Sequence, residues 1–302
     1  MSPVDNVGIL VIGYNRPLHL TNLLNQLRFM HPNNLMIFID GAIESDFENY
    51  YLVSECRKIV NSIDWIKDFR TFFPDTNLGC ALGVTSAITW AFTIFDKLII
   101  LEDDLVIHKN AIDFFRETLD KYGSHKQIFG ITGFLPIRSE SRIYLSRYPQ
   151  IWGWATWKDR WEQYLLIGNT SRSTLYLKII AYFRFNLLLS FVHSINNLQV
   201  ERRIIDTWDY KLMKLFILNR YFFVLPPFNL VVNNGFDSKA THTKYNTGSY
   251  PDISLQNYKS NFNLAVPLYN KNIDKLVLRF KTRVVLLLIW NRLKYYIKLI
   301  TR

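Results

Sequence analysis

The 302-residue sequence has few cysteines, glycines and prolines, and it has no long apolar run. Its two cysteines, Cys56 and Cys80, are too few for a disulfide framework and form no CxxC metal motif, so a reducing compartment suits the chain. Twelve glycines and ten prolines exclude a collagen-like or low-complexity chain. The lack of about 18 consecutive uncharged apolar residues argues against a membrane-spanning helix.

The N-terminus also lacks the features of a secretory signal peptide. Asp5 stands where such a peptide carries positive charge, and the apolar run from Val7 to Ile12 is too short for its hydrophobic segment. We therefore expect a cytoplasmic protein. With 49% hydrophobic and 20% charged residues, the chain has enough apolar surface for a full core, and its length allows one large domain or two ordinary ones.

The net charge of +11 is concentrated near the C-terminus. Residues 273–302 contain a single acid, Asp274, and eight bases: Lys275, Arg279, Lys281, Arg283, Arg292, Lys294, Lys298 and Arg302. An apolar run, Val284 to Ile289, and the aromatic Trp290 lie among these bases. This pattern is typical of a helix that lies in the interface of an anionic membrane. The alternative is a C-terminal helix packed on the domain with a solvated basic side. No recognition motif accompanies the charge, so nucleic-acid binding is not expected.

Short apolar runs alternate with helical patterns through the first 132 residues. The runs that predict strands are 7–13, 35–39, 69–73, 98–101 and 128–132. The helical patterns begin at Pro17 and cover about 48–62, 81–95 and 111–122. Strands separated by helices of this length predict βαβ units and a largely parallel sheet.

The pattern changes after residue 132. Residues 133–172 are rich in tryptophan and have little periodicity, whereas 174–196 is helix-like. A helical segment at 207–218 then precedes a strand at 221–224. The polar stretch 233–251 is expected to be a long loop, and long loops in compact domains are usually lids or disordered.

Polar clusters follow three of the predicted strands. They are Tyr14-Asn15-Arg16, Asp40-Gly41 and Glu102-Asp103-Asp104. In an open α/β sheet, ligands bind beyond the carboxyl ends of the strands. Three consecutive carboxylates repel one another, and a hard cation such as Mg²⁺ or Mn²⁺ would relieve that repulsion. The alternative is a solvated acidic turn, or a helix cap ahead of Ala111.

The segment Asn77-Leu78-Gly79 leads into the predicted helix 81–95. Free backbone amides at a helix start favour an anion. The segment lacks the lysine of a Walker motif and the spacing of GxGxxG, so it is not a standard phosphate loop. Glycines at this helix start could instead permit close packing.

Together these residues resemble the GT-A-fold glycosyltransferases, specifically the family 2-like and N-acetylglucosaminyltransferase I-like group, over about residues 5–245. The elements that carry the resemblance are Ile12-Gly13-Tyr14-Asn15-Arg16-Pro17, Phe38-Ile39-Asp40-Gly41, Asn77-Leu78-Gly79, Leu101-Glu102-Asp103-Asp104 and Trp152-Gly153-Trp154-Ala155-Thr156-Trp157. The resemblance implies an α/β GT-A domain over residues 1–270, with a mostly parallel central sheet flanked by helices. Its nucleotide-binding half would cover about 1–132 and its acceptor half about 133–270, before a basic amphipathic helix at 271–302.

The resemblance also implies an activity and its partners. A sugar would move from a nucleotide-diphosphate sugar, with a UDP-sugar the first expectation, to a glycan or lipid-linked acceptor. The donor would contact Tyr14, Asn15, Arg16, Asp40, Asn77, Gly79, Glu102 and Asp103. Asp104 would contact Mn²⁺ or Mg²⁺, while Asp103 or Glu102 would reach the ribose or a water on the metal. His242, in the expected loop, would be a further metal ligand or an ordinary solvated histidine.

An inverting transfer needs a carboxylate that takes the proton of the acceptor hydroxyl. The family's base is an Asp at a helix start in the second half, and Ile205-Asp206-Thr207-Trp208-Asp209 is similar. We expect Asp206 to be the base, with Asp209 as the substitute, although an Asp at a helix start is often only a cap. Trp152, Trp154 and Trp157 would stack on acceptor sugars, unless they only pack the turn that holds them.

Two functions follow from the sequence. The first is a metal-dependent, inverting glycosyltransferase that builds a cell-surface glycan as a peripheral protein at the inner face of the cell membrane. The second is a non-catalytic peripheral membrane protein that retains the same fold. Intact acidic residues at Asp40, Asp103, Asp104 and Asp206 favour the enzyme.

Overall fold

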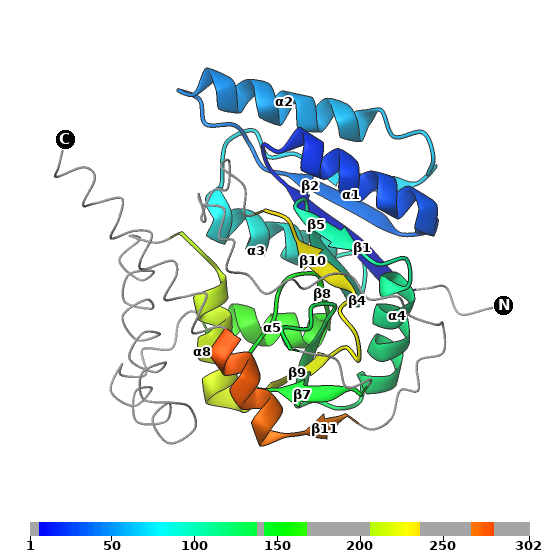
Figure 1. The fold of residues 1–302 in the computed structure, drawn as a ribbon. Helices are drawn as coiled ribbons and strands as arrows, with labels where there is room; N and C mark the ends of the chain where they lie inside the picture. The colour runs from blue at the N-terminus through cyan, green and yellow to red at the C-terminus, as the bar shows by residue number, and fades with distance from the viewer. Residues whose placement is uncertain (1–5, 138–141, 168–205, 236–266, 281–302) are drawn as a thin grey trace, which may run out of the picture.

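The structure is a computed structural model that describes residues 6–137, 142–167, 206–235 and 267–280. Within these ranges the chain forms a nine-stranded mixed sheet in the order β11-β7-β9-β6-β8-β4-β1-β2-β3, with helices against it (Figure 1). Its strands are β1 (Val7–Gly13), β2 (Leu35–Ile39), β3 (Phe69–Phe72), β4 (Lys97–Glu102), β6 (Ile128–Thr132), β7 (Tyr144–Ser146), β8 (Trp154–Trp157), β9 (Phe222–Leu225) and β11 (Leu268–Tyr269). A second, two-stranded sheet pairs β5 (Leu105–Ile107) with β10 (Val231–Asn233).

Most neighbouring strands of the large sheet are parallel. The strands β3, β2, β1 and β4 run in one direction, as do β6 and β9. Strand β8 lies antiparallel between β4 and β6, and β7 is antiparallel to β9. The expected α/β class with a largely parallel sheet is therefore confirmed.

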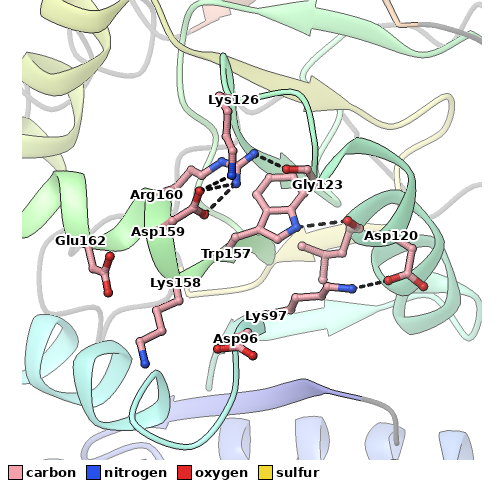
Figure 2. A pocket seen from close by; sticks show the side chains of 11 residues that line it. Asp96, Lys97, Asp120, Gly123, Lys126, Trp157, Lys158, Asp159, Arg160 and Glu162 are labelled. Atoms are coloured by element: carbon pink, nitrogen blue, oxygen red, sulfur yellow. Dashed lines mark hydrogen bonds and ion pairs between the residues drawn. The ribbon is translucent and has the colours of Figure 1, made fainter. Parts of the chain in front are cut away.

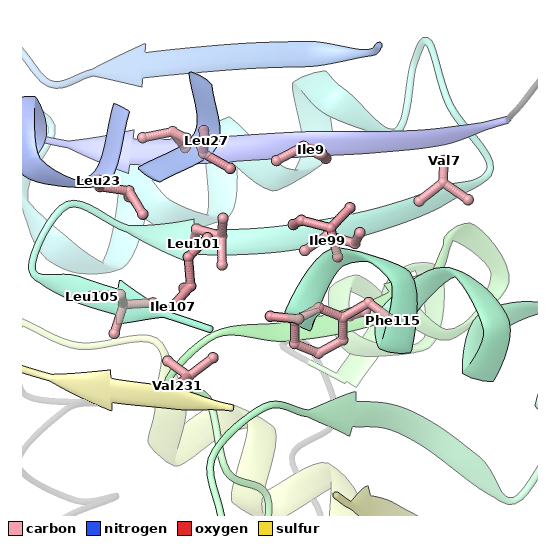
Figure 3. Packing of buried hydrophobic residues seen from close by; sticks show 14 of the residues in the cluster. Val7, Ile9, Leu23, Leu27, Ile99, Leu101, Leu105, Ile107, Phe115 and Val231 are labelled. Carbon is pink, nitrogen blue, oxygen red and sulfur yellow. The ribbon is translucent and has the colours of Figure 1, made fainter. Parts of the chain in front are cut away.

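The helices cover both faces of the sheet. They are α1 (Pro17–Met30), α2 (Phe47–Asn61), α3 (Gly79–Ala91), α4 (Ala111–Tyr122), α5 (Lys158–Leu166) and α8 (Asp209–Asn219). Alternate residues of β1 point to opposite faces, as a strand requires. Ile9 and Val11 pack with α1, α2 and α4, and Figure 3 draws Ile9 together with Leu27 of α1 and Phe115 of α4. Leu10 and Ile12 pack with α3, α5 and α8.

The expected elements of the first 132 residues are all present, within a few residues of the expected ends. The helix expected over 81–95 begins at Gly79 and ends at Ala91. Residues 133–172 are more regular than their sequence indicates, because they contain β7, β8 and α5. All four residues of β8 are buried between two strands, so the strand has no polar face from which a period could be read.

Part of the basic C-terminal segment is packed against the domain. Residues 271–280 are helical (Figure 1), and Ile273 and Val277 are buried against β7, β9 and α8. For these ten residues the alternative of a helix packed on the domain applies. Residues 281–302 lie outside the described residues, and so do the helix-like stretch 174–196 and most of the expected loop. Among the described residues, the structure contains no helix with the length and hydropathy needed to span a membrane.

Candidate functional site

The carboxyl ends of three parallel strands bring the predicted polar clusters to one edge of the sheet. Strand β1 lies between β2 and β4, with Gly13 opposite Ile39 and Ile12 opposite Glu102. The residues that follow these three strands therefore emerge side by side. This edge is where an open α/β sheet binds its ligands.

Asp104 is held by groups from two other parts of the chain. Its Oδ2 accepts a hydrogen bond from Nη1 of Arg16 at 2.9 Å, and its Oδ1 accepts one from Nδ2 of Asn233 at 3.3 Å. The backbone amide of Asn234 also donates to the carbonyl of Asp104, at 2.9 Å. A Cβ at Gly235 would lie 2.0 Å from Oδ2 of Asp104, so only glycine fits there without a shift.

Asp103 and Glu102 complete a compact acidic cluster. Asp103 is buried, and its Oδ2 accepts a hydrogen bond from the backbone amide of Tyr14 at 3.3 Å. Burial and the neighbouring Asp104 raise the pKa of Glu102 and of Asp103 above their ordinary values. Burial also raises the pKa of Asp104, although Arg16 opposes that rise. Burial is the main cause of these shifts, and it disfavours the charged form of all three carboxyls; a cation bound among them would favour that charged form.

Asp40 fixes the segment that leads into α3. It is 6% exposed. Its Oδ1 accepts from the amides of Gly41 and Leu78 at 2.7 and 3.0 Å, and its Oδ2 accepts from the amide of Gly79 at 3.1 Å. The side-chain amide of Asn77 donates to the same Oδ2 at 3.3 Å. Burial raises the pKa of Asp40, although these amide hydrogen bonds oppose the rise. Asp40, Asn77 and Gly79 therefore lie together, and they contact one another.

Asp206 occupies the start of α3. Its Oδ2 accepts a hydrogen bond from the amide of Cys80 at 2.6 Å, and its Oδ1 accepts one from the amide of Ala81 at 3.1 Å. Gly79 has φ = +78°, and a Cβ there would lie 2.4 Å from Oδ2 of Asp206. The helix start that the sequence predicted to favour an anion thus binds the carboxylate of this same chain.

Asp209 begins α8 one turn further along. Its Oδ1 accepts a hydrogen bond from Oγ1 of Thr207 at 2.6 Å. Its negative charge contributes to the raised pKa of Glu102 and of Cys80. Asp209 therefore lies within electrostatic range of both the acidic cluster and the start of α3.

The three tryptophans separate into different environments. Trp154 is 1% exposed and stacks on Trp208 with ring centroids 5.7 Å apart. Trp157 is 5% exposed and donates its indole hydrogen to the carbonyl of Leu119 at 3.1 Å. Because both rings are buried, the structure favours the alternative that Trp154 and Trp157 pack the turn and the core over a contact with an acceptor sugar.

Trp152 is partly exposed and precedes β8. Strand β8 pairs antiparallel with β4, with Trp154 opposite Ile100, so the start of β8 lies toward the carboxyl end of β4. A Cβ at the adjacent Gly153 would contact Val231 at 2.9 Å. Val231 belongs to β10, the strand whose Asn233 reaches Asp104. Of the three tryptophans, Trp152 alone remains a candidate for contact with an acceptor.

A pocket of about 470 Å³ lies at the opposite edge of the sheet, around the start of β4 (Figure 2). Trp157 lines it together with Lys97, Lys126 and Asp159. Lys97 pairs with Asp120, and Lys126 pairs with Asp159 at 2.7 Å. Since these charges are matched within the pocket, it has no excess charge to attract a donor phosphate, and the carboxyl edge remains the better candidate.

The described side chains fit a cation held partly by its substrate. Within the described ranges, no group of three or more His, Cys, Asp or Glu side chains is arranged to hold a metal ion. Mg²⁺ and Mn²⁺ commonly use one or two carboxylates together with substrate phosphates. The acidic cluster supplies such carboxylates, and burial together with the neighbouring Asp104 raises the pKa of Glu102 and of Asp103. His242 lies outside the described residues.

Several residues of this edge were not predicted. Asn233 is the last residue of β10 and Gly235 lies two residues later. Polar residues at the end of an apolar strand were the signal that identified the other clusters, and the same signal is present here. Asn49 is buried, and it joins the hydroxyl of Tyr14 at 2.6 Å to the amide of Ile43 at 2.9 Å. Arg57 donates to the carbonyl of Pro74 at 2.6 Å and to that of Asp40 at 3.3 Å. Arg57 could have been found from the sequence, because a charged residue beside the apolar residues of a helix indicates a buried hydrogen-bond partner.

Asn15 is partly exposed after the end of β1, beside Tyr14 and Arg16. The structure therefore brings the predicted residues of the first, second and fourth strands to one edge, together with Asp206 and Asp209.

In comparisons with known proteins, no family model matches the chain, and no curated protein is significantly similar to it.

Proposed function

We propose that the protein is a metal-dependent glycosyltransferase that uses a nucleotide-diphosphate sugar, with a UDP-sugar the first candidate. The observation that carries the proposal is the acidic cluster Glu102-Asp103-Asp104 at the carboxyl end of β4, next to Tyr14 and Arg16 after β1. This placement supports a GT-A arrangement, in which the donor crosses the carboxyl edge of a parallel sheet. The sequence resemblance to the GT-A group rests on these same residues.

Asp104 and a neighbouring carboxylate would hold Mn²⁺ or Mg²⁺ together with the donor diphosphate. When bound, such a cation stabilises the negative charge of the departing nucleoside diphosphate. Arg16 lies 2.9 Å from Asp104, so it is placed to add positive charge at the same point. Tyr14, Asn15, Asp40 and Asn77 would surround the nucleoside, either directly or by fixing the loops around it.

The proton of the acceptor hydroxyl needs a carboxylate that can take it, and Asp206 and Asp209 are the candidates. Both oxygens of Asp206 already accept amide hydrogen bonds from α3, so protonation would break one of these bonds. Among the described residues, Asp209 accepts a hydrogen bond from the side chain of Thr207 and makes no such pair of contacts to a helix start, and its charge acts on Glu102. We therefore assign the base to Asp209 ahead of Asp206, which reverses the order expected from the sequence.

A non-catalytic relative with the same fold is the second candidate function. The specific observation in its favour is that Asp40 and Asp206 both bind backbone amides around α3, which is a structural role that needs no substrate. Either candidate would act as a peripheral protein at an anionic membrane through residues 281–302.

A binding screen tests the proposal. Thermal unfolding of the full chain is measured with a panel of nucleoside diphosphates, each with and without Mn²⁺. A ligand at a hundredfold excess over its Kd stabilises the folded state by about 2.7 kcal/mol, so the matching nucleotide should stand out. We expect stabilisation that requires Mn²⁺. If no nucleotide stabilises the protein in either condition, the proposed site is wrong.

A further inference from the structure

The start of α2 presents a group of aromatic side chains to solvent. Phe47 is 92% exposed, Tyr50 65% and Tyr51 61%. Because residues three and four positions apart are neighbours on a helix surface, these rings share one face of α2, while Asn49 and Val53 on the other face are buried. An exposed apolar residue that stands alone needs no explanation, but a contiguous group with a polar rim is typical of a surface that binds another molecule.

Acidic side chains surround these rings. Glu44 and Glu48 are exposed on either side of Phe47 in the sequence. Lys58, an exposed base further along α2, is paired with Glu55 at 2.8 Å, so it does not offset their charge. We define the acidic aromatic surface by its exposed residues, which are Ile43, Glu44, Phe47, Glu48, Tyr50 and Tyr51.

The helix of residues 271–280 presents a surface of the opposite charge. Lys271, Lys275 and Arg279 are exposed and lie four residues apart, so they form a row along one side of this helix. Ile273 and Val277 are buried on its other side. Apolar and aromatic side chains that are 43% to 53% exposed accompany the bases. We define the basic apolar surface by its exposed residues, which are Leu268, Tyr269, Lys271, Lys275, Leu276 and Arg279.

The acid of this helix does not offset the charge of the basic apolar surface, because it is used inside the protein. Asp274 is buried, and one of its oxygens accepts a hydrogen bond from Nε of Arg147 at 2.6 Å. The other oxygen accepts one from Oγ of Ser146 at 3.1 Å. These contacts hold the helix against the body of the protein. The exposed side of the helix is therefore presented at a fixed place, and such rigidity lowers the entropic cost of binding a partner.

The two surfaces lie at different ends of the molecule. In Figure 1, α2 lies at the top, whereas the helix of residues 271–280, drawn in orange, lies beside α8 in the lower part. The two surfaces therefore do not contact each other within one copy. An anionic lipid bilayer would attract the basic apolar surface, but it would repel the acidic aromatic surface and leave its rings uncovered. A second copy of the chain complements both surfaces.

We infer that copies of this chain associate head to tail, with the acidic aromatic surface of one copy docked on the basic apolar surface of the next. The contact is heterologous, since it joins two different surfaces, and every added copy leaves one surface of each kind free. Aromatic rings supply much of the energy of such contacts, while the charges around them select and orient the partner. The assembly therefore grows with protein concentration, or closes into a ring, and it weakens as salt screens the charges. It does not depend on the proposed function.

Sedimentation velocity of the full chain, over a series of protein concentrations, tests the inference. Glu48→Lys and Lys275→Glu each reverse one charge at an exposed position. We expect either substitution to raise the Kd of association by about tenfold or more, because like charges then oppose each other. An equimolar mixture of the two variants should regain the behaviour of the wild type, since the reversed surface of each variant is complementary to the reversed surface of the other.

Control variants separate the contact from net charge and from folding. Glu117→Lys and Lys121→Glu make the same changes of net charge at exposed positions of α4, away from both surfaces, and they should associate as the wild type does (Figure 1). Phe47→Ser removes the most exposed ring of the acidic aromatic surface. It should weaken association as the charge reversals do, while cooperative unfolding stays unchanged.

A wild-type protein that sediments as a monomer at every concentration overturns the inference. A mixture of Glu48→Lys and Lys275→Glu that behaves like the two variants apart overturns it as well, because the two surfaces then do not meet. Binding to phosphatidylglycerol vesicles is measured beside the sedimentation. If the wild type is monomeric and Lys275→Glu loses vesicle binding, the basic apolar surface binds a lipid surface and not a second copy.

Discussion

Asp206 lies at the start of α3, where its Oδ2 accepts a hydrogen bond at 2.6 Å from the backbone amide of Cys80, 126 residues earlier in the chain. A second bond, from the amide of Ala81, completes the contact. The carboxylate therefore serves as the cap of a helix to which it does not belong. It also joins the start of α8 to the edge of the sheet where the acidic cluster lies.

We predict that Asp206→Ala lowers the free energy of unfolding by about 1 kcal/mol, the usual effect of removing a helix cap. The loss arises because two amides at the start of α3 lose their acceptor. Denaturant unfolding followed by circular dichroism measures it. Asp209→Ala is the matched control and should change stability less, since the hydrogen bond that its carboxylate accepts in the described part of the chain comes from the neighbouring side chain of Thr207. Equal stability of Asp206→Ala and wild type would show that the cap is not formed in solution.

The base assignment gives a prediction of turnover. Asp209→Asn should lower the transfer rate by about 10² to 10⁴, the range for a positioned general base, while donor affinity stays within a few-fold. Asp206→Asn should have the smaller effect on rate. Steady-state release of the nucleoside diphosphate, with donor affinity measured separately, distinguishes the two. A larger loss in Asp206→Asn would restore the assignment that the sequence favoured.

The sequence predicted the first half of the sheet well because those strands are buried on both faces and alternate with amphipathic helices. Strands β1, β2 and β4 are apolar runs that end in polar clusters, so local pattern was sufficient to predict that these clusters meet at the edge where the strands end. The burial of Trp154 and the cap formed by Asp206 depend on partners far away in the sequence. The local periodicity of a sequence carries no information on such distant contacts, so the roles of Trp154 and Asp206 could not be predicted from residue spacing.

Asp274 illustrates a signal that was present and was not used. It is the one acid among eight bases in residues 273–302, which is an unusual position for a solvated residue in a basic segment. In the structure it is buried and paired with Arg147. A lone charge of opposite sign beside the apolar residues Ile273 and Val277 predicts an ion pair with the domain. That ion pair would in turn have predicted that residues 271–280 pack against the domain.

Substitution of Asp274 tests how firmly the C-terminal helix is attached. We expect Asp274→Asn to lower the free energy of unfolding by about 2 kcal/mol, since hydrogen bonds to a charged group contribute about 1.5–3 kcal/mol and Arg147 is partly open to water. Denaturant unfolding provides the measurement. Glu55→Gln is the control, because the Glu55–Lys58 pair is exposed and its loss should change stability very little. If both variants match the wild type, the helix is not held by this ion pair.

Gly235 offers a way to disturb Asp104 without replacing it. A Cβ at this position would lie 2.0 Å from Oδ2 of Asp104 and 3.0 Å from Nη1 of Arg16, so one of these groups must move. We expect Gly235→Ala to weaken Mn²⁺-dependent nucleotide binding by about tenfold, equivalent to about 1.4 kcal/mol. Isothermal titration calorimetry measures the change. Gly123→Ala, whose Cβ would come no closer than 3.3 Å to a neighbour, should bind the nucleotide as the wild type does. Unaltered binding by Gly235→Ala would place the nucleotide away from Asp104.

Release of nucleoside diphosphate from nucleotide sugars, by transfer to water or to an acceptor, tests the central claim most directly. The full chain is incubated with a panel of nucleotide sugars with and without Mn²⁺, beside Asp104→Ala and the exposed control Asp113→Ala. We predict release from at least one nucleotide sugar that requires Mn²⁺, that is retained by Asp113→Ala and that is lost in Asp104→Ala. If no nucleotide sugar in the panel is turned over while nucleotide binding persists, or if Asp104→Ala is as active as the wild type, the protein is not the metal-dependent glycosyltransferase proposed here.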